Sequence, residues 1–70
     1  MNYHALLSRR QREIATLVAA GASNKEIAYQ LAISIKTVKN TLTTVFVKTQ
    51  TRSRTELAVR LVQSRFAVDQ

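Results

Sequence analysis

The sequence predicts an all-α domain of four helices with a central helix-turn-helix, and three observations support this prediction. Apolar residues recur at spacings of three and four along most of the chain, the spacing of one helix face rather than of a strand. A serine precedes each of these runs, and three of the four serines have Gln or Glu three residues later, as in a capping box. Proline is absent, and no repeat or low-complexity stretch is present.

The first predicted helix begins at Ser8, where Gln11 completes an S-x-x-Q capping box, and it runs to about Ala20. Gly21, the only glycine, is expected to be the left-handed residue that ends this helix. The buried stripe of the helix is predicted to consist of Ile14, Leu17 and Val18.

The second and third helices are predicted from two closely spaced caps. Ser23 has Glu26 three residues later, which starts the second helix, and Ser34 can cap a third helix soon afterwards. The connection then covers only Leu31 to Ile33, about the length found between the helices of a helix-turn-helix.

The third helix has one polar face near its start. Lys39, Asn40 and Thr43 share this face with Lys36. Lysine can donate to guanine O6 or N7, asparagine can pair with adenine N6 and N7, and the threonine methyl group can contact a thymine methyl group. A merely solvated helix face is the simpler alternative, but the preceding helix and turn favour a face that reads DNA bases in the major groove.

The last predicted helix begins at Ser53 with Glu56 in its capping box and continues to about Phe66. Its apolar surface is wider than a one-sided core needs, because Val59 and Phe66 extend the buried arc past Val62. A homodimer interface formed by Val59, Val62 and Phe66 would use this surface. The alternative is that these side chains simply fold over the core of a very small domain.

Composition limits the classes of function. The 70 residues are enough for one core, and 11 Lys and Arg against 4 Asp and Glu give a formal charge of +7, which predicts a polyanionic partner, double-stranded DNA in the first place. A basic helix on a membrane surface is the alternative, but no run approaches the roughly 18 apolar residues of a span. No signal peptide is recognisable and cysteine is absent, and a DNA partner would place the protein in the cytoplasm.

An enzyme is not expected. The only histidine is His4, and no nucleophile, base and orienting group occur together, so we expect no catalytic residues, no metal site and no cofactor. The carboxylates are scattered along the chain at Glu13, Glu26, Glu56 and Asp69.

Several motifs together resemble a known family. They are L-S-R-R-Q-R-E-I at residues 7–14, S-N-K-E-I-A at 23–28, I-S-I-K-T-V-K-N at 33–40 and S-R-T-E-L-A at 53–58, with an Ala-Gly turn at 20–21. In this order and spacing they resemble the LuxR-type DNA-binding domain over about sixty residues.

The expected organisation is a flexible segment at residues 1–6, the LuxR-type domain at 7–67 and a tail at 68–70. The resemblance implies a transcriptional regulator that binds a two-fold symmetric DNA site as a dimer. Its third helix would read the major groove, and its fourth helix would mediate dimerisation. RNA polymerase is a further candidate partner. A promoter-binding module similar to sigma-factor region 4, acting within RNA polymerase, is the alternative. The phosphate-binding positions of the family would fall on Ser23, Asn24, Lys25, Lys36, Thr37 and Lys48.

The sequence departs from the family pattern at the corner between the third and fourth helices. The family commonly has Leu and Val where this chain has Thr49 and Thr51. Because two apolar anchors are replaced by hydroxyl-bearing side chains, we expect this corner to be looser than in the family.

Overall fold

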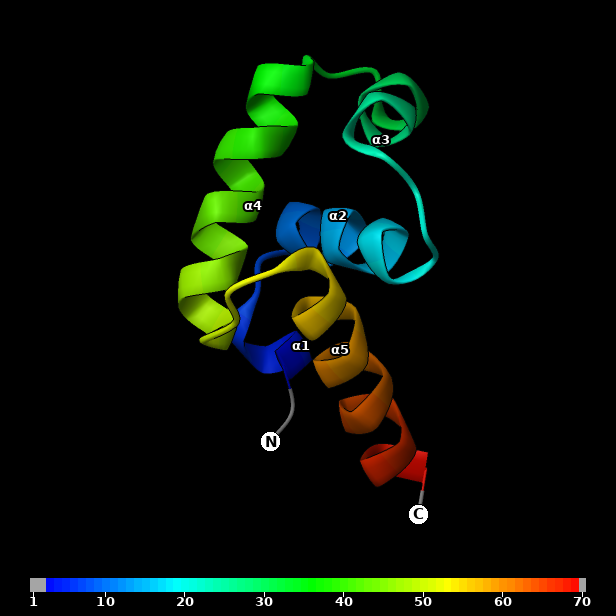
Figure 1. The fold of residues 1–70 in the computed structure, drawn as a ribbon, viewed down its shortest axis with the longest axis vertical. Coiled ribbons are helices and arrows are strands. Elements are labelled where there is room, and N and C mark those ends of the chain that lie inside the picture. The colour runs from blue at the N-terminus through cyan, green and yellow to red at the C-terminus, as the bar shows by residue number, and fades with distance from the viewer. Residues whose placement is uncertain (1–2, 70) are drawn as a thin grey trace.

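The computed structural model describes residues 3–69, with side chains described for residues 5–63. Four helices form the predicted all-α domain and a single helical turn precedes them, so that the order is α1 (Tyr3–Leu6), α2 (Arg9–Ala19), α3 (Asn24–Leu31), α4 (Ile35–Thr49) and α5 (Arg54–Asp69). In Figure 1, α3 and the start of α4 lie at one end of the molecule, and the end of α5 lies at the other. No helix in the described part of the chain combines the length and apolarity needed to cross a membrane.

The helices begin at the serine caps that the sequence predicts. At α2, the Ser8 hydroxyl accepts from the Gln11 N–H at 3.2 Å, and the Ser8 N–H donates to Gln11 Oε1 at 2.9 Å. Ser23 and Glu26 form the same reciprocal pair at α3, at 3.1 and 2.8 Å. Both boxes satisfy donors that a helix start otherwise leaves unpaired. The remaining two caps are Ser34, which accepts from the Thr37 N–H, and Ser53, which accepts from the Glu56 N–H.

Three helices end on a residue with positive φ: Gly21 at +93°, Ala32 at +56° and Gln50 at +55°. After each of these, the next N–H donates to a carbonyl five residues back, at 3.0 Å in every case. This is the Schellman arrangement, which satisfies carbonyls at the end of a helix. The sequence predicted it only at Gly21, because alanine and glutamine seldom adopt a left-handed conformation.

The core lies where α2 packs against α4 and α5, and where α3 packs against α4. Ile14, Ile27, Val38 and Leu57, one from each of the four main helices, are fully buried. Their burial fixes how the helices pack, because a side chain removed from water on every side allows little displacement. Among the residues whose side chains are described, the other buried apolar ones are Leu7, Ala15, Val18, Ala28, Leu42 and Val45.

Both ends of the chain carry more helix than the sequence predicts. The expected flexible segment 1–6 contains the helical turn α1, which packs against α4 and leads directly into the buried Leu7. Burial of Leu7 therefore anchors α1 to the core. At the other end α5 continues to Asp69, past the predicted end at Phe66 and into the expected tail, and no Gly or Pro follows Phe66 to stop it.

The corner between α4 and α5 differs from the loose turn that we expected. Thr49 and Thr51 are both buried, and their hydroxyl groups lie 2.9 Å apart. Thr49 Oγ1 also donates to the carbonyl of Val45 at 2.8 Å. A hydroxyl has one proton, so Thr51 is the donor in the pair. The two substitutions thus replace apolar contact with a satisfied pair of hydroxyls at this corner.

Candidate nucleic-acid interface

The helix-turn-helix consists of α3, residues 32–34 and α4. The left-handed Ala32 reverses the chain, and Ser34 caps α4 by accepting from the Thr37 N–H at 3.0 Å. Ile27 on α3 and Val38 on α4 are fully buried on the inner sides of the two helices. Because these inner faces are packed in the core, the polar outer faces of α3 and α4 keep a fixed position and orientation relative to each other.

The three predicted base-reading residues share the exposed face of α4. Lys39, Asn40 and Thr43 are all exposed, and Lys36 is exposed one turn before Asn40. Thr43 Oγ1 donates to the carbonyl of Lys39 at 3.1 Å. With its hydroxyl proton committed to the helix, Thr43 can present its methyl group and an acceptor to a ligand. Together these side chains offer cationic, amide and methyl groups, which suit a mixed set of base edges.

Five of the six predicted phosphate-binding residues, all except Lys48, lie near the starts of the two helices. Lys25 and Lys36 are exposed cations in the first turns of α3 and α4. The hydroxyls of Ser23 and Thr37 already take part in caps, since Ser23 accepts from Glu26 and Thr37 contacts Ser34 at 2.9 Å. These caps leave each helix start rigid, with its positive dipole end toward solvent, a favourable setting for an anion.

Glu26 is the one acidic side chain in the first turn of α3, beside Lys25. The hydrogen bond from the backbone N–H of Ser23, together with the contact to the Ser23 hydroxyl, lowers the pKa of Glu26 below its ordinary value. The carboxylate therefore stays charged and remains committed to the capping box at neutral pH. Lys25 supplies the opposite charge at the outer surface of the same turn.

Lys48 lies apart from the other predicted phosphate ligands. It occupies the last turn of α4, and a helix rises about 1.5 Å per residue, which places its backbone roughly 18 Å along the axis from Lys36. Its Nζ donates to Gln11 Oε1 at 3.0 Å, the same oxygen that accepts from the Ser8 N–H. The structure therefore associates the Lys48 side chain with the start of α2 rather than with the starts of α3 and α4.

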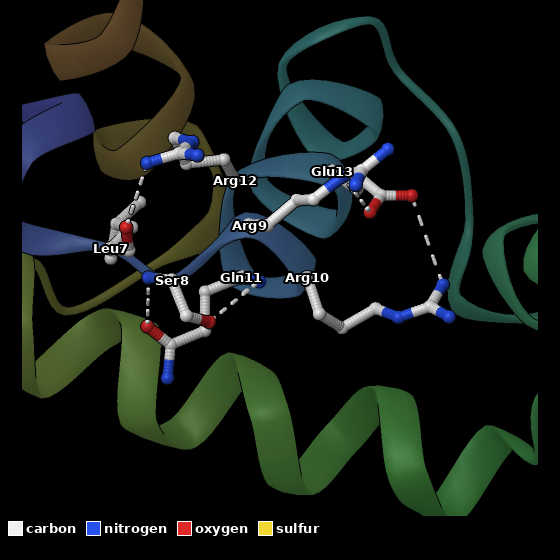
Figure 2. A network of polar contacts seen from close by, with 7 residues as sticks. All are labelled: Leu7, Ser8, Arg9, Arg10, Gln11, Arg12 and Glu13. Carbon is white, nitrogen blue, oxygen red and sulfur yellow. Dashed lines mark hydrogen bonds and ion pairs between the residues drawn. The ribbon is translucent and has the colours of Figure 1, made fainter.

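The start of α2 carries a basic cluster that is partly neutralised. Figure 2 shows Arg9 and Arg10 on either side of Glu13, at N–O distances of 3.9 and 3.8 Å. Arg12 Nη1 donates instead to the carbonyl of Leu7 at 3.1 Å (Figure 2). Exposed ion pairs of this kind contribute about 0–1 kcal/mol, so the cluster is a weaker candidate for a specific site than the face of α4.

Sequence reasoning missed one contact at the helix-turn-helix. Arg54, the first residue of α5, donates from Nη1 to Asn24 Oδ1 at 2.5 Å and from Nη2 to the carbonyl of Ala22 at 2.6 Å. Asn24 is a predicted phosphate ligand, and this contact spans 30 residues. Helix patterns concern neighbours in sequence, so no local signal could have revealed it.

The outer side of α3 holds a shallow groove lined by Lys25, Glu26, Tyr29 and Gln30. Tyr29 is 90% exposed. Among the described residues, no three His, Cys, Asp or Glu side chains lie close enough together to hold a metal ion. The candidate site is therefore built from cations, amides, hydroxyls and helix starts.

Residues 5–61 match the family described as "Bacterial regulatory proteins, luxR family". The chain belongs to this family. This confirms the resemblance of its motifs, and it identifies a DNA-binding domain of transcriptional regulators rather than an enzyme.

Similar proteins agree with the luxR assignment. The chain is 52% identical over 56 residues to a "Monoamine regulon transcriptional regulator" of Klebsiella aerogenes, a match that covers 80% of this chain and 25% of that protein. It is 49% identical over 55 residues to the "Putative HTH-type transcriptional regulator YhjB" of Escherichia coli, a match that covers 79% of this chain and 28% of that protein. It is 45% identical over 56 residues to the "Transcriptional regulatory protein LiaR" of Bacillus subtilis, a match that covers 80% of this chain and 26% of that protein. The matched part thus amounts to about a quarter of the length of these relatives.

Proposed function

We propose that this luxR-family domain binds double-stranded DNA in a sequence-specific manner, with α4 in the major groove and Lys39, Asn40 and Thr43 facing the base edges. The observation that carries the proposal is the single exposed face of α4, where these side chains stand free of the core while the opposite face is buried. A helix held in this way can enter the groove, which is wide enough for one helix, without any change in the fold.

Phosphate contacts are proposed for the starts of α3 and α4, where exposed lysines and capped helix ends lie side by side. Such contacts fix the register of a protein on DNA but carry no sequence information. The formal charge of +7 supports these contacts, since it favours association with a polyanion. A DNA partner would place the domain in the cytoplasm. The proposed ligands are Ser23, Asn24, Lys25, Lys36 and Thr37, and Lys48 would join them only by leaving Gln11.

A homodimer through α5 is the second part of the proposal. Val59 and Val62 are 48% and 45% exposed, so both leave apolar surface outside the core of one copy. Phe66, the third predicted interface residue, lies outside the residues whose side chains are described. Two copies related by a two-fold axis would read half-sites about one helical turn apart.

Selection of bound sequences from a random duplex pool tests this function. We expect enrichment of a two-fold symmetric site, and the variants Lys39→Ala and Asn40→Ala should each alter one position in each half of that site. A pool that stays random after repeated selection would contradict sequence-specific binding. An enriched site without two-fold symmetry would support sequence-specific binding but contradict the proposed dimer.

A further inference from the structure

The guanidinium group of Arg54 connects two helices that are distant in sequence. One of its nitrogens donates to Asn24 Oδ1 and another to the carbonyl of Ala22, and the two acceptors flank Ser23, the cap of α3. Both contacts are partly buried. A planar guanidinium can hold two acceptors in a fixed fork, so the contact defines both the position and the orientation of what it binds.

The contact sets the orientation of the Asn24 amide. Arginine has donors only, so the atom of Asn24 that faces it must be the carbonyl oxygen. The NH2 group of Asn24 then points away from the guanidinium and is the part of the side chain left to bind a ligand. A phosphate oxygen accepts hydrogen bonds, so this orientation suits a phosphate and the opposite one would repel it.

The charge of Arg54 remains in place beside this site. Both of these acceptors are neutral oxygens, an amide and a backbone carbonyl, so these contacts do not neutralise the positive charge of Arg54. Fixed positive charge next to a capped helix start favours an anion there. Arg54 is also the first residue of α5, the helix that carries Val59 and Val62.

We propose that Arg54 is a positioning residue for DNA phosphate binding, which acts through Asn24 and the start of α3 without contacting DNA itself. This inference rests on the proposed function. Through the same contact, the proposed dimerisation helix is joined directly to the proposed phosphate site, so the pose of α5 and the geometry of DNA binding are linked.

A double-mutant cycle on a non-specific duplex tests the proposal. Asn24→Ala should weaken binding on the order of tenfold, the effect of losing one hydrogen bond to a charged group. Arg54→Ala should weaken it by a similar factor, and the double variant should bind no worse than Arg54→Ala alone, because the second change removes a group that is already misplaced. Two effects that multiply in the double variant would overturn the proposal.

The salt dependence of binding distinguishes positioning from direct contact. A side chain that touches a phosphate contributes about one unit to the slope of log K against log salt. Arg54→Ala should lower this slope by clearly less than one unit, because its charge lies near the phosphate without touching it, and a fall of about one unit would show that Arg54 is itself a phosphate ligand, contrary to the proposal. All binding is measured well below the melting temperature of each variant, so that loss of folding does not enter.

Two further variants serve as controls. Arg52→Ala removes the same charge from an exposed neighbour, and its effect should multiply with that of Asn24→Ala, which separates net charge from positioning. Arg54→Lys keeps the charge but cannot hold both acceptors in a fork, so it should also weaken binding; wild-type affinity in this variant would overturn the proposal. If Arg54→Ala does not fold, the cycle is completed with Arg54→Lys. Absence of any DNA binding by the unmodified chain would contradict the proposed function as a whole.

Discussion

At the scale of single residues, α4 presents side chains of different chemistry to solvent, and each should make a distinct contribution to binding. Lys39 and Asn40 lie on the proposed base-reading face, whereas Lys25 and Lys36 lie at helix starts. A contact to a base edge discriminates between sequences, while a contact to a phosphate does not.

We therefore predict that Lys39→Ala and Asn40→Ala each cost about 1–3 kcal/mol at the selected site and change random-sequence binding much less. Lys25→Ala and Lys36→Ala should weaken all sequences alike and reduce the salt slope by about one unit each. Titrations of a selected and a scrambled duplex over a range of salt concentrations measure both quantities. If Lys39→Ala and Asn40→Ala lost equal affinity for the two duplexes, Lys39 and Asn40 would not contact the base edges.

The threonine pair at the corner of α4 and α5 gives a second prediction. Thr49→Val removes the acceptor of the Thr51 hydroxyl and leaves a buried donor unpaired, which should cost about 1–3 kcal/mol of unfolding free energy. Thr51→Val should cost less, because Thr49 still donates to Val45. The double valine variant should be close to the wild type or more stable, since both partners become apolar groups of similar shape. Urea unfolding of the wild type, the two single variants and the double variant completes a double-mutant cycle. Losses of unfolding free energy that add in the double variant would show that the two hydroxyls do not interact.

At the scale of the helices, local rules account for the starts of the elements and fail at some of their ends. The capping boxes at Ser8 and Ser23 join residues three positions apart, so the sequence alone predicts them. The ends at Ala32 and Gln50 could not be predicted, because neither residue favours positive φ and the surrounding packing enforces it.

This strain gives a prediction about stability. A left-handed conformation costs an L-residue about 1–2 kcal/mol, and glycine avoids this cost while losing about 0.5–1 kcal/mol through the greater freedom of its unfolded chain. Ala32→Gly should therefore raise the unfolding free energy by about 0.5–1 kcal/mol, because Ala32 is exposed and its methyl group has no core contacts to lose. The reverse change, Gly21→Ala, places a side chain at φ +93° and should lower it. Thermal and urea unfolding check both, and a destabilised Ala32→Gly would mean that the methyl group packs in the turn.

The contacts that sequence could not supply are those between distant elements. Exposure of Lys39, Asn40 and Thr43 agrees with the helix periodicity, which depends only on near neighbours. The contacts of Arg54 with Asn24 and of Lys48 with Gln11 span 30 and 37 residues, and they depend on how the helices pack. The same holds for Thr49 and Thr51, where family comparison suggested lost apolar packing and the fold instead brings two hydroxyls together.

At the scale of the whole molecule, the proposed base-reading face and the proposed dimer surface lie on different helices, α4 and α5. The molecule measures 36 × 20 × 20 Å, with α3 and the start of α4 at one end and the end of α5 at the other (Figure 1). Base reading and dimerisation can therefore be separated by mutation, provided that the change on α5 leaves the core intact. Val59 meets this condition, because it is 48% exposed and follows the buried Leu57 by two residues, a spacing that places the two side chains on different sides of the helix.

The last prediction concerns Val59→Asp. If α5 pairs two copies about a two-fold axis, each copy places an aspartate near its symmetry mate in a region shielded from water, and the dimer should be lost. The monomer should keep its helical content and bind a single half-site as before, because the exposed side chain contributes little to the core. Affinity for the full symmetric site should fall much further, since the energetic link between half-sites is gone.

The same substitution at Val47, which is exposed on α4, serves as the control for sedimentation, because it adds the same charge away from the proposed interface. Sedimentation should show fewer dimers for the Val59 variant and no change for the Val47 variant, and gel shifts on full and half-sites complete the comparison for Val59. A Val59 variant that still binds the full site cooperatively would place the dimer on another surface. A Val59 variant that unfolds would show that Val59 belongs to the core. Helical content is measured on the same samples, so unfolding is distinguished from the loss of a dimer.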